Sequence, residues 1–348
     1  MLCDIHNHLG KGMTAEEVSE YYLKLKTANG VDRNCILSIP VSPSAKVYHT
    51  QNLLSLQVKD MLTPYSSAFM GLVHGEGAED YLTQLKNGLE MGFEGLKILE
   101  CHPSLELELD FRMNDTRFDA MFQYAEDNGI PILMHVADPE ESWDINTINE
   151  YALTHGRFYG AEGRRQKEEY YREIDDILQR HPKLKVIFAH FYFLSADIDR
   201  ATVLFEKYPN VCFDLTPGKE MYENFGKDLG KTRAFFERFA DRLYYGTDVN
   251  DTSAINYHSS LYTLVSTALE SKEPFEWRDY TCAGLGLSDE TKEKIMSGNF
   301  IKLLGETPKP LNYEAVRREI TRLESISDSF GDKDIEQLAV AKQYFADK

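Results

Sequence analysis

The chain has 348 residues, of which 42% are hydrophobic, and a formal net charge of -19 at pH 7. This length fits one α/β barrel with additions, and the negative charge disfavours nucleic-acid partners, which require clustered Lys and Arg. No apolar run is long enough to cross a bilayer, and an apolar strand from Leu2 leaves no room for a leader. With five cysteines that show no paired spacing, we expect a cytoplasmic protein without membrane partners.

Short apolar runs alternate with segments of helical periodicity along almost the whole chain. This alternation is typical of a parallel sheet with crossover helices, and eight units of it predict a (β/α)8 TIM barrel. The predicted strands are 2–6, 34–39, 68–73, 95–99, 130–135, 185–190, 211–215 and 243–247. The predicted helices are 14–28, 51–62, 78–91, 115–128, 167–181, 196–208, 230–240 and 288–304.

Two predicted connections, 136–163 after the fifth strand and 249–286 after the eighth, are longer than is usual for a barrel. Both follow strands that end in a candidate metal ligand, so we interpret them as insertions that shape a substrate pocket, with ordinary surface insertions as the alternative. We predict a barrel domain over residues 1–305. Residues 306–348 keep a helical periodicity, which predicts a C-terminal helical extension that packs on the barrel or pairs protomers.

The segment Asp4-Ile5-His6-Asn7-His8 follows a short apolar start of the chain and includes most of the first predicted strand. Side chains alternate between the faces of a strand, so His6 and His8 point the same way and one cation can bind both imidazoles. A polar strand end is the other interpretation of this pair. Asp4, two residues before His6, is a candidate for orienting a ligand imidazole or for plain core packing.

Three later apolar runs each end in one residue that can bind a metal, namely His135, His190 and Asp248. The carboxyl ends of parallel barrel strands are where barrel enzymes place their chemistry. Zinc binds imidazole nitrogen and carboxylate oxygen, and a catalytic zinc keeps one position open. We therefore predict one divalent metal ion, with Zn2+ favoured over Mn2+, Fe2+ or Ni2+. The predicted ligands are His6, His8, His135 and Asp248.

Two of these residues are predicted to be catalytic. A metal of this kind lowers the pKa of its bound water to about 7. Asp248 is then placed to accept the water proton and pass it to the leaving group. His190 is better placed to polarise a carbonyl or hold an oxyanion than to act as a fifth ligand.

Four further residues are predicted to bind substrate: Lys97, Arg157, Arg164 and His74. Lys97 ends the fourth strand, where a lysine can bind a substrate carboxylate, bridge two metals as a carbamate, or serve only as a strand-end charge. Arg157 and Arg164 lie in the first long loop among aromatic residues, a composition that suits a planar, anionic small molecule. His74 follows the third strand, from which it can reach the pocket or remain a solvated loop residue.

With these residues assembled, the chain resembles the amidohydrolase superfamily over residues 2–305. Within it the similarity is to amidohydrolase-related family 2, which includes aminocarboxymuconate-semialdehyde decarboxylase-like enzymes. The motifs that carry the resemblance are Asp4-x-His6-x-His8, Gly95-Leu96-Lys97, Pro131 to His135, His181-Pro182 leading to Ala189-His190, Tyr245-Gly246-Thr247-Asp248, and Lys294 to Phe300.

The resemblance implies a mononuclear metal, usually zinc, at the positions of His6, His8, His135 and Asp248, with His190 acting in catalysis. It leaves the role of Lys97 open, because this group lacks an obligatory bridging lysine. Many relatives have a small residue after the counterpart of His190, whereas this chain has Phe191-Tyr192, which predicts a tighter pocket.

These observations predict a metal-dependent hydrolase that uses metal-activated water on an amide, ester or lactone bond of a small, carboxylated substrate. The alternative is a non-oxidative, metal-dependent decarboxylase of a small carboxylic acid on the same scaffold. A catalytically silent barrel used for binding is a third class. The expected partner is a small-molecule substrate, and a homodimer is the default for an enzyme of this size.

Overall fold

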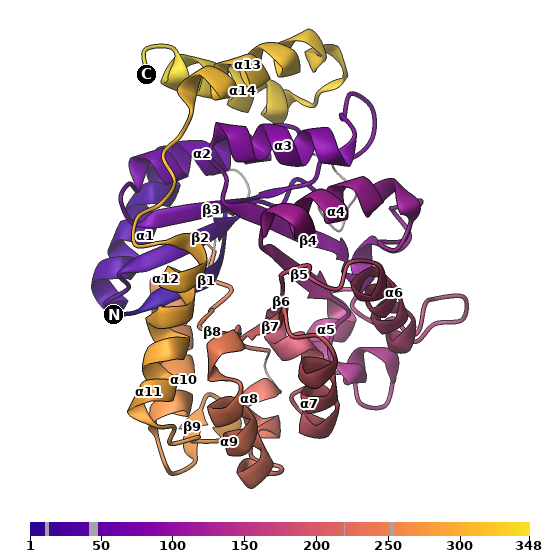
Figure 1. The fold of residues 1–348 in the computed structure, drawn as a ribbon, viewed down its shortest axis with the longest axis vertical. Coiled ribbons are helices and arrows are strands. Elements are labelled where there is room, and N and C mark those ends of the chain that lie inside the picture. The colour runs from indigo at the N-terminus through magenta and orange to yellow at the C-terminus, as the bar shows by residue number, and fades with distance from the viewer. Residues whose placement is uncertain (11–13, 42–47, 219, 251–253) are drawn as a thin grey trace.

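The computed structural model describes residues 1–10, 14–41, 48–218, 220–250 and 254–348. Eight parallel strands lie side by side in chain order, and helices surround them (Figure 1), which confirms the predicted TIM barrel. The strands are β1 (Cys3–His8), β2 (Arg33–Leu37), β3 (Ser66–Gly71), β4 (Gly95–Cys101), β5 (Ile132–Val136), β6 (Val186–Phe188), β7 (Val211–Asp214) and β8 (Leu243–Tyr244). The helices between and after them are α1 (Ala15–Asn29), α2 (Gln51–Met61), α3 (Tyr81–Met91), α4 (Asp119–Asn128), α6 (Lys167–Arg180), α7 (Ile198–Lys207), α9 (Leu229–Arg238), α11 (Asp289–Glu293) and α12 (Asn299–Leu304).

The barrel closes where its first strand meets the segment that follows β8. Ile5 N–H donates to the Tyr245 carbonyl at 3.0 Å, and His8 N–H donates to the Val249 carbonyl at 2.8 Å. Between them, Asp248 N–H donates to the His6 carbonyl at 2.9 Å. The closing seam therefore fixes Asp248 beside the histidine pair through backbone bonds alone.

Alternate strand residues divide between two buried clusters. Ile5, Leu37, Phe69, Leu133 and Ile187 belong to one cluster that packs against α12, as expected for a barrel interior. Their sequence neighbours pack against the surrounding helices in the other cluster. Because most strands pack apolar side chains on both faces, their sequences are the short apolar runs from which they were predicted.

The chain ends in a helical hairpin, α13 (Tyr313–Ser325) and α14 (Asp332–Phe345), which lies against α2 and α3 (Figure 1). Asp60 at the end of α2 accepts hydrogen bonds from Tyr313 and Tyr344, each at 2.7 Å. Thr50, which precedes α2, donates its hydroxyl to Asp334 at 2.5 Å. The hairpin thus packs on the barrel, while a domain boundary after residue 305 stays a prediction.

The connections after β5 and β8 contain further helices and strands. The first includes α5 (Glu150–Thr154) and the second includes α10 (Ile255–Glu270) and the hairpin β9 (Phe275–Trp277) and β10 (Tyr280–Cys282). A four-residue helix, α8 (Met221–Asn224), follows β7. Among the described residues, no helix is long and apolar enough to span a membrane.

A buried histidine on α10 predicts that the fold loses stability in mild acid. The His258 side chain contacts the Tyr21 hydroxyl, and burial lowers its pKa from 6.5 to about 4, although the charge of Asp248 opposes this shift. The unfolded chain therefore takes up this proton first, so stability is present above pH 6.5 and is lost as the pH falls towards 4. We expect a loss of about 1–3 kcal/mol from this group.

Urea unfolding of the metal-free protein at neutral pH and near pH 4.5 measures this loss. His258→Gln keeps a polar contact with Tyr21 but has no titrating group, so its stability is expected to fall less between the two pH values. Equal losses in the two proteins would show that His258 does not contribute.

Candidate functional site

The two histidines of β1 converge with Asp248 at the carboxyl end of the barrel. His6 Nε2 lies 2.9 Å from His8 Nε2. One oxygen of Asp248, Oδ1, lies 3.5 Å from His6 Nε2 and 3.3 Å from His8 Nε2. These three ligand atoms form a compact group that can hold a metal ion.

The hydrogen bonds on the far side of each imidazole fix its tautomer. His6 Nδ1 lies 2.7 Å from a carboxylate oxygen of Asp214, and His8 Nδ1 lies 3.0 Å from the Leu37 carbonyl. Both partners only accept, so each Nδ1 carries the proton and each Nε2 has a lone pair. Two lone pairs and a carboxylate oxygen then face one another without a proton between them. This donor set fits a divalent cation that accepts nitrogen and oxygen, such as zinc.

Left-handed backbone geometry marks three of the strand ends around this group. Ala137 after β5 has φ 63°, Asp248 after β8 has φ 60°, and His190 after β6 has φ 55°. His190 begins a run of four left-handed residues that ends at Phe193. Side chains other than glycine reach this region at a cost of about 1–2 kcal/mol per residue. Strain of this kind clusters at functional sites, where surrounding contacts hold it in place.

The left-handed run decides where its aromatic side chains point. Phe191 stacks on Phe236 with ring centroids 5.8 Å apart, and Tyr192 stacks on Phe188 at 4.1 Å, so both belong to the core beneath the helices. The expectation that they tighten the pocket is wrong. Phe193 instead stacks on His190, with ring centroids 5.2 Å apart and planes inclined by 20°.

His135, the fourth predicted ligand, lies in a second group with His102 and Asp138. Its Nε2 is 3.0 Å from the Ala137 carbonyl and 3.7 Å from Asp138, so Nε2 carries the proton and Nδ1 keeps the lone pair. Burial lowers the pKa of His135 to about 3, which keeps the imidazole neutral. Its role as a metal ligand stays a prediction, with Nδ1 as the available atom.

The second group is better described as a hydrogen-bonded network than as another metal site. His102 Nδ1 accepts the backbone N–H of Ser104 at 3.1 Å, so its Nε2 carries the proton and has no lone pair for a metal. That nitrogen faces Asp138 at 3.5 Å, and Tyr159 donates its hydroxyl to the same carboxylate at 2.8 Å. The Asp138 carboxylate therefore faces hydrogen-bond donors on three segments of the chain, those that contain His102, His135 and Tyr159.

Lys97 is the predicted substrate-binding residue that lies against the metal-binding group. Its Nζ is 3.3 Å from His6 Nε2, and the residue is 2% exposed. Within the described part of the chain it forms no ion pair. Burial lowers its pKa to about 8, while the charges of Asp248 and Asp214 oppose the shift, so at neutral pH the amine remains mostly protonated.

The other three predicted substrate residues are placed differently. His74 bonds Glu100 through Nε2 at 2.7 Å and Tyr81 through Nδ1 at 3.1 Å, so both ring nitrogens are engaged. Arg164 pairs with Glu106 at 2.9 Å and donates to the Pro103 carbonyl at 2.7 Å. Arg157 is exposed in the connection after β5. Contact of these side chains with a substrate stays a prediction.

A family model described as amidohydrolase matches residues 46–305 of the sequence. The chain belongs to the amidohydrolase family. The match begins after the histidine pair, so His6 and His8 are placed in the site by the structure rather than by the family model. A sequence search of curated proteins gave no match.

Solved structures share the fold of this amidohydrolase at low sequence identity. A 2,6-dihydroxybenzoate decarboxylase from Rhizobium is 14% identical, with a TM-score of 0.54 over 87% of this chain and 98% of that one. A 4-oxalomesaconate hydratase from Rhodopseudomonas palustris is 14% identical, with a TM-score of 0.54 over 94% of this chain and 100% of that one. An IDCase from Metarhizium anisopliae is 13% identical, with a TM-score of 0.55 over 87% and 96%. At these identities the similarity establishes the fold and not the reaction.

Sequence reasoning missed two carboxylates of the amidohydrolase site, Asp138 in the second group and Asp214. Asp214 ends β7 and bonds His6 Nδ1, the role for which Asp4 was considered. A bulge in β1 between Asp4 and Asn7 interrupts the alternation, and Asp4 instead accepts hydroxyl hydrogen bonds from Thr247 and Tyr262. Asp214 could have been found, because Val211-Cys212-Phe213-Asp214 is another apolar run that ends in a possible ligand.

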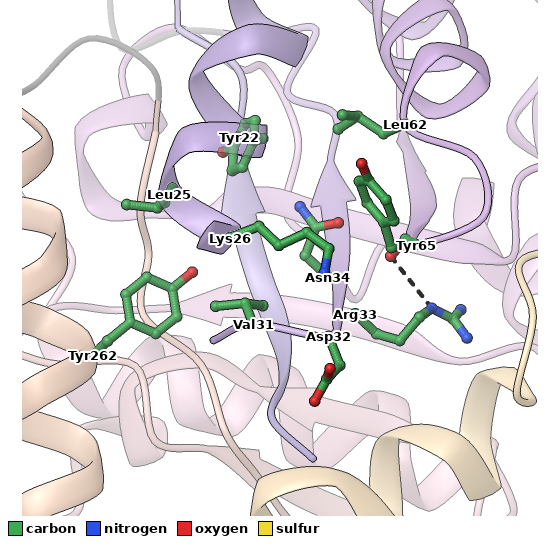
Figure 2. A pocket seen from close by; sticks show the side chains of 10 residues that line it. All are labelled: Tyr22, Leu25, Lys26, Val31, Asp32, Arg33, Asn34, Leu62, Tyr65 and Tyr262. Carbon is green, nitrogen blue, oxygen red and sulfur yellow. Dashed lines mark hydrogen bonds between the residues drawn. The ribbon is translucent and has the colours of Figure 1, made fainter. Parts of the chain in front are cut away.

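A small pocket at the opposite end of the amidohydrolase barrel is not a candidate substrate site. Its lining includes Arg33 and Asn34 at the start of β2 and Tyr65 just before β3, with Lys26 from α1 beside them (Figure 2). Its volume of about 10 Å³ admits roughly one water molecule. It lies at the amino ends of strands whose carboxyl ends face the metal-binding group.

Proposed function

We propose that the protein is a metal-dependent hydrolase that cleaves an amide, ester or lactone bond in a small, carboxylated substrate. The observation that carries this proposal is the set of three unprotonated ligand atoms that face one another on His6, His8 and Asp248. Fixed tautomers and backbone strain at the same strand ends support a site built for chemistry rather than a polar strand end.

The proposed metal is a single divalent ion, with Zn2+ first, held by His6, His8 and Asp248, with His135 as the fourth ligand. Such an ion polarises a substrate carbonyl and makes water a better nucleophile near neutral pH. The Asp248 side chain is 41% exposed, so its carboxylate is accessible to accept the proton of the attacking water and pass it to the leaving group. His190 is the proposed second catalytic residue.

Lys97 is proposed to bind a carboxylate of the substrate. A buried ammonium without an ion pair binds an anionic ligand favourably, because the ligand supplies the counter-charge whose absence makes burial costly in free energy. Because Lys97 Nζ lies 3.3 Å from His6 Nε2, a carboxylate bound to Lys97 would also lie close to the proposed metal. Arg157 is proposed as a second cationic contact with the substrate. His74 and Arg164 are also proposed to bind the substrate.

The same lysine favours a second candidate function, non-oxidative decarboxylation. If a substrate carboxylate binds between Lys97 and the metal-binding group, the bond that joins this carboxylate to the rest of the substrate would lie at the centre of the site. This is the bond that decarboxylation breaks. An acid must then protonate the carbon that loses carbon dioxide. Hydrolysis remains the first proposal, because Asp248 is an accessible proton acceptor and hydrolysis begins with proton removal from water.

The test is a panel of carboxylated esters, lactones, amides and aromatic acids, incubated with metal-loaded protein in water enriched in oxygen-18. Hydrolysis is expected to place one heavy oxygen in the product. Release of carbon dioxide without heavy oxygen in the organic product would select the second candidate. The absence of any turnover across the panel by protein that holds its metal would contradict both.

Replacing Lys97 with methionine is expected to reduce kcat/KM for a carboxylated substrate by about 10²-fold, because a buried, charged contact of this kind contributes about 2–3 kcal/mol. A neutral analogue that lacks the carboxylate is expected to lose much less. Steady-state kinetics with the acid and the analogue make the comparison. Equal losses of kcat/KM for the acid and the analogue would show that Lys97 does not bind the carboxylate.

We also propose a cytoplasmic homodimer. All five cysteines are free and buried, which suits a reducing compartment. Closed pairs are the commonest assemblies of soluble enzymes, and light scattering after gel filtration measures the mass directly.

A further inference from the structure

Asp214 is a carboxylate beside the proposed metal site, and this inference rests on that proposed site. It is fully buried at the end of β7. Its Oδ2 accepts the proton of His6 Nδ1 at 2.7 Å. Its Oδ1 accepts two backbone N–H groups, from His190 at 2.8 Å and from Thr216 at 3.1 Å. One side chain therefore binds the imidazole of a proposed ligand and the backbone of the proposed catalytic histidine.

The segment that follows Asp214 acts on the same two histidines. The Thr216 carbonyl lies 3.3 Å from His190 Nδ1, and the Thr216 hydroxyl lies 3.1 Å from His6 Nδ1. The carbonyl can only accept, so His190 carries its proton on Nδ1 and keeps a lone pair on Nε2. His6 and His190 thus share one tautomer, and residues 214–216 set it for both.

We propose that Asp214 is a positioning residue that commits His6 Nε2 to the metal and holds the first left-handed residue of the run His190–Phe193. In neutral His190 the unprotonated Nε2 accepts a proton rather than donates one. This tautomer of neutral His190 therefore has no proton on Nε2 to donate to an oxyanion. Both consequences follow from one buried carboxylate and its neighbouring carbonyl.

The substitution Asp214→Asn tests this role without changing the size of the side chain. The two backbone N–H groups can only donate, so the new amide must turn its oxygen towards His190 and Thr216. Its NH2 group then points at His6 Nδ1 and requires a lone pair there. His6 is driven to carry its proton on Nε2, the atom that faces His8, and is lost as a metal ligand.

Zinc affinity, measured by competition with a chromophoric chelator, is expected to fall about 10- to 100-fold in Asp214→Asn. Asp4→Asn is the matched control, because it removes an equally buried carboxylate from β1 that bonds hydroxyl and backbone groups but no imidazole. Its affinity is expected to stay within about threefold of the parent protein. Unchanged affinity in Asp214→Asn, or equal losses in the two variants, would overturn the inference.

Long-range proton–nitrogen NMR spectra of the metal-free protein, labelled with nitrogen-15 histidine, provide a second measurement that needs neither metal nor activity. His6→Gln assigns the His6 resonances. The parent protein is expected to show His6 protonated on Nδ1, and Asp214→Asn to show it protonated on Nε2. If Asp214→Asn fails to fold, the parent spectrum decides alone, and an Nε2 proton on His6 contradicts the inference. A parent protein that binds no zinc but shows the Nδ1 tautomer would defeat the proposed function and leave the tautomer assignment standing.

Discussion

Asp248→Asn is expected to lose the bound metal and to lower kcat/KM by at least about 10³-fold, which corresponds to about 4 kcal/mol of transition-state stabilisation. The amide removes the negative charge that Asp248 holds beside the two imidazole lone pairs. It also removes the accessible proton acceptor, so a ligand and a base disappear together. Elemental analysis of the purified protein and steady-state kinetics on an active substrate measure the two effects.

Thermal unfolding of the metal-free forms separates this loss from a folding defect. Asp248 closes the barrel through its backbone N–H, which the substitution retains. The metal-free variant is therefore expected to unfold within a few degrees of the metal-free parent. A variant that keeps about one metal per chain and reacts within tenfold of the parent would exclude Asp248 from both proposed roles.

Glu94→Gln is expected to lower the free energy of unfolding by about 3–5 kcal/mol, the largest effect on stability that we predict. Lys59 on α2 is buried, and its Nζ donates to Glu94 at 2.5 Å and to the Gly92 carbonyl at 2.6 Å. The other oxygen of Glu94 accepts the backbone N–H of Lys309 at 3.1 Å, which fixes the approach to the C-terminal hairpin. Removing the carboxylate charge leaves a buried ammonium without its counter-ion.

The double variant Lys59→Met with Glu94→Gln provides the control. An apolar side chain does not need a counter-charge, so much of the stability lost in the single variant is expected to return. Urea unfolding of the parent, both single variants and the double variant gives the coupling between the two residues. A loss below about 1 kcal/mol in Glu94→Gln alone would show that solvent reaches the ammonium and compensates it.

The barrel could be predicted because its information is local. Most strands contain a short apolar run that is covered on both faces, and the helices repeat their apolar residues every three or four positions. Segments such as 51–62 and 167–181 therefore matched α2 and α6 within a residue or two at each end. Asp4 shows where this reasoning fails. A bulge in β1 puts Asp4 on the opposite face of the strand from His6, and nothing in the sequence from Asp4 to His8 indicates the bulge.

The surroundings of the site depend on contacts between distant segments. His135 approaches His102 because the connections after β4 and β5 pack together through Asp138 and Tyr159. Tautomers are set by a carbonyl of β2 for His8 and by a carboxylate of β7 for His6. A strand-end pattern identifies which residues can bind a metal, but the second partner of each imidazole comes from another part of the barrel.

The seam between β1 and the segment after β8 joins residues that are synthesised far apart in time. The histidine pair leaves the ribosome before Asp248, which follows only after all eight strands have been made. A nascent chain therefore exposes two histidines without the carboxylate and the backbone bonds that complete the group. Tight binding of the proposed metal is therefore expected only after β8 and Asp248 have been made, so occupancy of the proposed site would report that all eight strands have been synthesised.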